Sequence, residues 1–164
     1  MKSKLLIALS MILCLSTFTL TLTSCGNDDE PSTTQKQKYS VKGTFIRQEG
    51  NYTEGEGGPN GSNSQEFRFY KGIYDEVVEI IKAQEWEVTF KASEKDQKIK
   101  EQNALAESRY TAMVRALDAV QKKLDAADKN TYKCNFSMTI EVKAVGESVI
   151  IAGQKTLKYQ GNED

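Results

Sequence analysis

TYKCNFSMTIEVKAVGESVIIAGQKTLKYQ, residues 131–160, is the stretch that decides the fold. Its first half places an apolar or aromatic side chain at every second position, and this alternation predicts a half-buried β-strand. Gly146-Glu147 fits a two-residue turn with glycine first, so the second half is expected to return antiparallel to the first. The alternating positions are Tyr132, Cys134, Phe136, Met138, Ile140, Val142 and Ala144.

This turn also fixes a pairing register for the predicted hairpin. A slip of one residue would turn every apolar side chain to the wrong face, and the chosen register keeps apolar residues together almost throughout. The exception is Lys155, which falls opposite Met138. The predicted partners are Ala144 with Val149, Val142 with Ile151, Ile140 with Gly153, Phe136 with Leu157, and Cys134 with Tyr159.

A long helix is predicted immediately before the hairpin, from Ser93 to about Asp128. Ser93 with Asp96 three residues later resembles a capping box, and Asn130 is a candidate for a left-handed stop. A helix of about 35 residues is roughly 50 Å long, enough to lie along the hairpin and cover its apolar face. The predicted inner seam is Ile99, Asn103, Ala106, Tyr110, Met113, Leu117, Val120, Leu124 and Ala127.

Shorter elements are predicted before this helix. Alternating residues indicate strands over Tyr39–Arg47 and Trp86–Ala92, and a broad apolar stripe indicates a helix over Ile73–Ala83. The predicted fold class is therefore α+β, in the order β-α-β-α-β-β. It is a two-layer sandwich in which an antiparallel sheet of about four strands is covered by one long and one short helix. The order of the strands stays open.

Two stretches are too polar to form part of a core. Residues 26–38 contain no aliphatic or aromatic side chain and are predicted to be a flexible tether. Residues 49–64 contain five glycines and one proline and are predicted to be a loop. A single folded domain is accordingly expected over 39–164, with this glycine-rich loop inside it.

The first 24 residues have the composition of a secretory leader. Lys2 and Lys4 precede an uncharged, mostly apolar run over 5–22, which is the order that export signals use. A membrane-spanning helix is the alternative, since the run is about long enough to cross a bilayer. The run is rich in Ser and Thr, however, and acidic residues rather than a basic cluster follow it, which favours the leader.

Leu22-Thr23-Ser24-Cys25 resembles the lipobox of bacterial lipoproteins. The resemblance implies cleavage before Cys25 and attachment of acyl chains to Cys25, so that 25–38 becomes a lipidated cysteine and its tether. Two or more acyl chains hold a protein firmly on a membrane. The acidic run Asp28-Asp29-Glu30 is similar to the export signal of Bacteroidota-type surface lipoproteins. It implies an outer-membrane location facing outward, with the periplasmic face as the alternative.

Composition argues against most catalytic and nucleic-acid-binding functions. Without the leader and its two lysines, 20 basic residues face 23 acidic ones, which offers no general attraction to nucleic acid. The chain has no histidine, the commonest general base and a common metal ligand. No catalytic residue, metal site or cofactor is predicted, and Cys134 on the apolar strand face is expected to be an inert thiol.

The function expected from the sequence is a non-enzymatic, lipid-anchored envelope protein that binds a protein or glycan ligand. Tyr52 in the glycine-rich loop is the candidate ligand-binding residue, because no pattern buries it. Trp86 is expected to pack in the core instead. The alternative is an inhibitor or immunity-type lipoprotein that binds a protein partner, and an enzyme is the third hypothesis.

Overall fold

A computed structural model describes residues 34–50, 64–147 and 150–162. Residues 32–164 form one compact unit. Its elements in chain order are β1 (Thr34–Gly50), α1 (Gln65–Ile81), β2 (Gln84–Lys91), a short 3-10 helix (Ala92–Glu94), α2 (Lys95–Ala126), β3 (Asn135–Val145) and β4 (Ile150–Gln160).

The four strands form one antiparallel sheet in the order β2-β1-β3-β4. Strand β1 holds the sheet together, because its two halves have different partners. Thr34–Val41 pairs with β2, and Ser40–Gly50 pairs with β3. The register of the second ladder shifts between Phe45 and Arg47, so that Ile46 forms a β-bulge and is half exposed.

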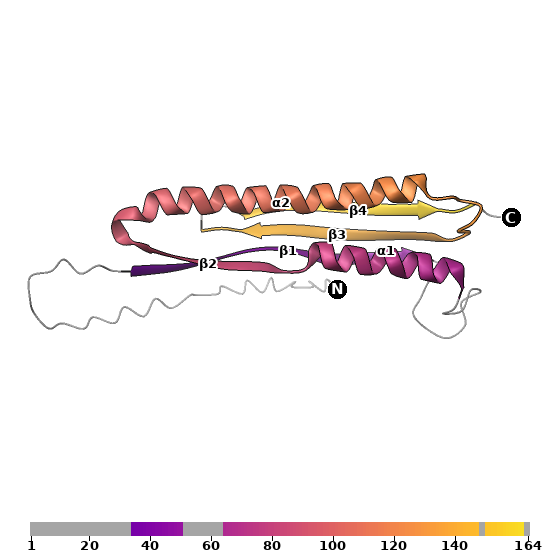
Figure 1. Cartoon of the computed structure of the whole chain (residues 1–164), viewed down its shortest axis with the longest axis horizontal. Helices are drawn as coiled ribbons and strands as arrows, with labels where there is room; N and C mark the ends of the chain where they lie inside the picture. The colour runs from indigo at the N-terminus through magenta and orange to yellow at the C-terminus, as the bar shows by residue number, and fades with distance from the viewer. Residues whose placement is uncertain (1–33, 51–63, 148–149, 163–164) are drawn as a thin grey trace, which may run out of the picture. The chain divides into compact units, whose positions relative to one another are not determined.

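Both helices pack on the same face of this sheet, which confirms the predicted α+β sandwich (Figure 1). Helix α2 contacts all four strands. Its 32 residues span about 48 Å, whereas the 11-residue strands of the hairpin span about 36 Å. The helix therefore extends beyond the hairpin, and its first half covers the β1–β2 ribbon.

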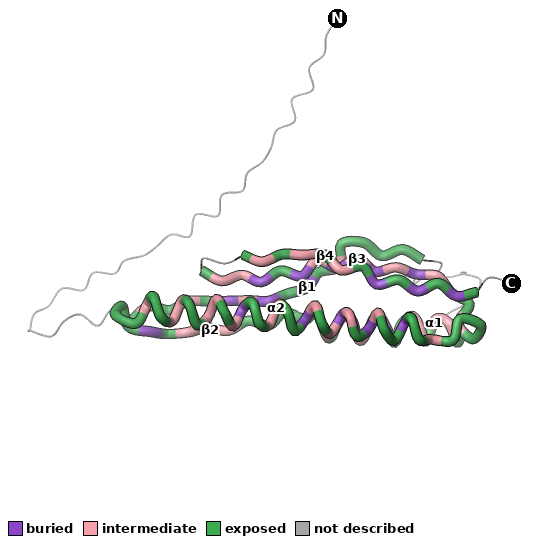
Figure 2. Tube along the Cα trace, turned by 90° about the horizontal axis from the view of Figure 1, so that it is seen from above, coloured by how far each residue is buried: buried purple, intermediate pink, exposed green. Residues whose placement is uncertain are grey.

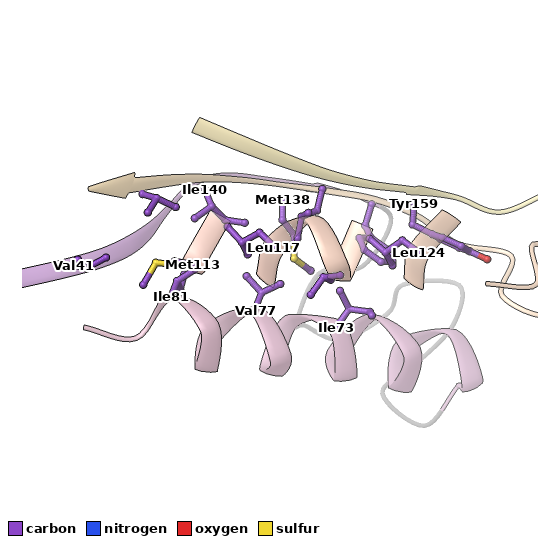
Figure 3. Close-up of a cluster of buried hydrophobic side chains, with 14 of the residues drawn as sticks. Val41, Ile73, Val77, Ile81, Met113, Leu117, Leu124, Met138, Ile140 and Tyr159 are labelled. Carbon is purple, nitrogen blue, oxygen red and sulfur yellow. The ribbon is translucent and has the colours of Figure 1, made fainter. Parts of the chain in front are cut away.

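The core lies between the sheet and the two helices (Figure 3). Burial alternates strictly along β3, where every second residue is inaccessible. The predicted seam of α2 is confirmed through its centre, whereas Ile99 and Tyr110 at its N-terminal half are only partly buried. The buried members of α2 are Ala106, Met113, Leu117, Val120 and Leu124, and those of α1 are Ile73, Val77 and Ile81.

The hairpin register predicted from the sequence was wrong by two residues. The ladder pairs Val145 with Ile150 and Met138 with Leu157, so four residues, 146–149, separate the paired strands instead of the two that the predicted turn at Gly146-Glu147 requires. A shift of two residues keeps every side chain on its predicted face. The observed register stacks Phe136 on Tyr159, with ring centroids 5.6 Å apart. It also leaves Lys155 free to pair with Asp118 of α2.

The ends of α2 also differ from the prediction. Ser93 lies in the 3-10 helix and does not cap α2, whose N-cap residue is Glu94. The Glu94 carboxylate instead accepts a hydrogen bond from the backbone N–H of Lys91 at 3.2 Å. At the other end Asn130 has no left-handed conformation. The chain turns through Asp128, whose carboxylate accepts bonds from the Asn130 N–H and the Thr131 hydroxyl.

The beginning of the domain lies earlier than predicted. Residues 34–38, assigned to the tether, extend β1, because β2 supplies hydrogen-bonding partners for them. Glu49 and Gly50, assigned to the loop, end the same strand. Helix α1 begins at Gln65 rather than Ile73, since the Ser64 hydroxyl accepts a bond from the Phe67 N–H at 3.0 Å and caps it. Residues 51–63 lie outside the described part of the chain.

The outer edge of β4 is closed by a side chain of α2. The Gln121 amide donates to the Lys158 carbonyl at 3.0 Å and accepts from the Lys158 N–H at 2.8 Å. These two bonds occupy the backbone N–H and C=O of Lys158, two of the groups that a further strand would need. The inward-directed Lys155 beside it, paired with Asp118, is a second device that disfavours edge-to-edge association.

Gln121→Ala is expected to open this edge. Three hydrogen bonds are lost, two to the Lys158 backbone and one to the Asp125 carboxylate, which lowers the free energy of unfolding by about 1–2 kcal/mol. The exposed Lys158 backbone becomes available for strand pairing. Sedimentation velocity over a concentration series should detect self-association. Gln97→Ala, an exposed glutamine of the same helix, is the matched control. A Gln121→Ala protein that stays as monomeric as this control would contradict the edge-closing role.

Candidate functional site: the open face of the sheet

The face of the sheet opposite the helices is uncovered by the described residues. We call it the open face. Alternation along each strand sends one set of side chains into the core and the other set onto this face, and burial follows the same period. Its members include Lys36, Lys38, Ser40, Lys42, Thr44, Arg47 and Glu49 of β1, Glu85, Glu87, Thr89 and Lys91 of β2, Asn135, Ser137, Thr139, Glu141 and Lys143 of β3, and Ala152, Gln154, Thr156, Lys158 and Gln160 of β4.

The open face is polar and carries no aromatic side chain among the described strand residues. The strand aromatics all lie on the face toward the helices. Most of them stack there on one another or on α1, as Phe45 does on Tyr74 with centroids 5.2 Å apart. The open face therefore lacks the flat apolar platform on which sugar rings stack. Hydrogen-bonding groups, such as the Thr139 and Thr156 hydroxyls 3.1 Å apart, make up most of its surface.

A shallow hollow of about 390 Å³ lies at the end of the sheet where β1 stops at Gly50. We call it the distal hollow. Side chains of three strands meet here because Glu49 pairs with Ser137, and Ser137 with Lys158. Arg47 forms an ion pair with Glu49 beside it. The lining residues are Glu49, Gly50, Asn135, Phe136, Ser137, Lys158, Tyr159 and Gln160.

A second shallow hollow of about 580 Å³ adjoins the distal hollow and shares Gln160 with it. The Asn162 side-chain amide donates to Asn130 Oδ1 at 2.7 Å, and the Asn162 backbone N–H donates to the Lys129 carbonyl at 3.0 Å. These bonds fix the end of the chain against the α2–β3 turn. Hydrogen bonds from Thr131 and from the Asn130 backbone lower the pKa of the Asp128 carboxyl in this turn, so Asp128 is ionised at neutral pH.

Lysines gather over the other half of the open face, from the beginning of β1 to its middle. Lys36 pairs with Glu87 at 2.6 Å and Lys38 with Glu85 at 3.2 Å. The Lys36 bond lowers the pKa of the Glu87 carboxyl. Lys42 of β1 lies directly opposite Lys143 of β3, a juxtaposition of like charges that opposes sheet formation.

The residues singled out by sequence fall into three groups. Cys25 and Tyr52 lie outside the described residues. Trp86 is partly buried, stacks on Tyr39 with centroids 5.8 Å apart and lies under the Arg109 guanidinium, so it packs as expected. Cys134 is completely buried, as predicted from its place on the apolar strand face.

In residues 34–50, 64–147 and 150–162, no three His, Cys, Asp or Glu side chains come together as metal ligands would. Among these same residues, no helix has the length and apolarity needed to cross a membrane. No protein-family model, curated protein or solved structure matches the chain.

Sequence reasoning missed the residues of the distal hollow. Their outward positions follow from the alternation along β3 and β4, so Asn135, Ser137 and Lys158 were recognisable as exposed. Their convergence with Glu49 was not recognisable, since it depends on the pairing of β1 with β3. That pairing joins strands almost 90 residues apart in the sequence.

Proposed function

We propose that this chain is a non-enzymatic, lipid-anchored binding protein of the bacterial envelope, displayed on the outer membrane. The observation that carries the binding role is the polar, uncovered sheet face with a hollow at its distal end. The lipobox residues Leu22–Cys25 and the acidic run after them support the anchor and the location. The absence of histidine from the whole chain argues against most acid–base chemistry.

A protein ligand suits this surface better than a glycan. The distal hollow presents amide, hydroxyl, carboxylate and ammonium groups, which match the polar rim of a protein interface. Its two aromatic lining residues, Phe136 and Tyr159, are buried with their side chains on the face toward the helices, so neither presents a ring for stacking on a sugar. An inhibitor or immunity-type protein is the second candidate function, because the same flat polar face would serve for binding a toxin or protease.

The binding role is tested by substituting the hollow. Ser137→Arg should place a bulky cation in the hollow and abolish capture of an envelope partner by cross-linking in cells. Ser108→Arg on the exposed surface of α2 is the matched control and should leave capture unchanged. Equal capture by both variants, together with no binding on glycan arrays, would reject the hollow as the binding site.

The anchor is tested separately. Cys25→Ser removes the only candidate acylation site, so the protein should move from the membrane to the soluble fraction. Mass spectrometry of the unmodified chain should show acyl groups on Cys25. Protease treatment of intact cells then distinguishes the two membrane faces, because only an outward-facing domain is digested before lysis.

A further inference from the structure

The compact unit of the chain, residues 32–164, carries no net formal charge. It contains all 20 basic residues that follow the leader and 20 of the 23 acidic residues, since only Asp28, Asp29 and Glu30 lie before it. Any attraction of this unit for anionic surfaces therefore depends on where its positive charges are placed.

Positive charge is concentrated in one cluster on the open face. Three neighbouring strands contribute five lysines and two glutamates over the half of this face that runs from Thr34 to Lys42 of β1. Among the described residues, Lys42 and Lys143 form no ion pair, although they face each other across two strands. Holding two unpaired like charges opposite one another costs stability, and an anionic partner would relieve that cost. The lysine cluster consists of Lys36, Lys38, Lys42, Lys91 and Lys143, with Glu85 and Glu87.

We propose that the lysine cluster docks on the anionic headgroups of the membrane that carries the lipid anchor, an inference that rests on the proposed anchoring at Cys25. Only eight residues separate Cys25 from Thr34, so a fully extended link reaches about 30 Å at most. The start of β1 is thus the part of the domain held nearest to the headgroups. Phosphate-bearing lipids are the anions that this covalent link brings to the cluster.

Docking at this end leaves the distal hollow accessible. Strand β1 runs 17 residues from Thr34 to Gly50, about 55 Å at 3.3 Å per residue. The right-handed twist of the strands turns the two ends of so long a face in different directions. Figure 2 shows the β2 end and the β3–β4 end of the sheet on different levels. The cluster therefore covers one half of the open face and the hollow lies at the far end of the other half, one orienting the domain and the other binding.

The test is vesicle co-sedimentation of the mature chain from residue 25 with Cys25→Ser, which carries no lipid. It should bind vesicles containing phosphatidylglycerol, bind phosphatidylcholine vesicles far less, and dissociate as salt is raised. Lys42→Gln with Lys143→Gln should weaken binding by about 30-fold, since each lysine near an anionic surface contributes about five-fold. Lys100→Gln with Lys122→Gln on α2 changes the net charge equally and should weaken binding much less.

Two results would overturn the proposal. One is an equal loss of binding in both double variants, which would mean that net charge alone determines binding to the vesicles. The other is a preference for soluble polyglutamate over phosphatidylglycerol vesicles, which would assign the cluster to an acidic protein partner. Because the tested chain lacks the lipid, this outcome is independent of the Cys25 fractionation result. Circular dichroism of each variant separates lost binding from lost folding.

Discussion

Replacing Leu117 by Ala should lower the free energy of unfolding by about 2–5 kcal/mol. Leu117 is completely buried in the centre of α2. There it lies between Val77 of α1 and Met138 and Ile140 of β3 (Figure 3). Removing three carbon atoms from this position loses apolar burial and leaves a cavity bordered by both helices and the sheet, which cannot collapse without moving one of them.

Urea denaturation measures this change, with a lower midpoint and an unchanged slope expected. Thr111→Ala, an exposed substitution on the same helix, should stay within about 0.5 kcal/mol of the unmodified protein. The free energy of unfolding of a domain of this size is about 5–15 kcal/mol in total, so the Leu117 variant loses a large part of it. A loss below about 1 kcal/mol would mean that α2 does not pack on the sheet by this seam.

Gly43→Ala should destabilise the domain by about 1–3 kcal/mol, although alanine usually suits a strand better than glycine. A β-carbon at position 43 would lie 2.3 Å from Cβ and 2.6 Å from Cγ2 of Ile81, and 3.2 Å from its Cα. These atoms belong to the last residue of α1 and are close to its backbone. The end of the helix must therefore move away from β1, which disturbs the contact of both with the core.

Gly72→Ala is the matched control for this prediction. Gly72 lies inside α1 and has no other atom within 4 Å of an added β-carbon, so the alanine should stabilise the helix by about 1 kcal/mol. The two glycine substitutions are thus expected to change the unfolding midpoint in opposite directions. A stabilising Gly43→Ala would contradict the close approach of α1 to β1.

Long periodic stretches were predictable from the sequence, because the pattern within each segment indicates whether it is a helix or a strand and which face is buried. The alternation from Phe136 to Ala144 and the spacing of Met113, Leu117 and Val120 depend only on strand and helix geometry. Their burial was correctly predicted before any partner was known. The element order and the two-layer fold class followed from these patterns and were confirmed.

Polar strand residues were not predictable in the same way. Residues 34–38 have the composition of a linker, and they form part of β1 only because β2 lies beside them. The Lys36–Glu87 and Lys38–Glu85 pairs show cross-strand complementarity, which becomes visible only when the two strands are aligned. The distal hollow and the lysine cluster were missed for the same reason, since their members come from separate strands.

By itself, the sequence determined the order of the strongly periodic helices and strands and which side of each faces the core. The physical cause is local, because the periods of 2 and 3.6 residues arise from the backbone geometry of a single segment. The tertiary structure alone decided the strand order, the hairpin register and the surfaces where function is proposed. Registers two residues apart bury the same side chains, so alternation could not choose between them. Contacts made across the fold, Phe136 on Tyr159 and Lys155 with Asp118, distinguish the observed register.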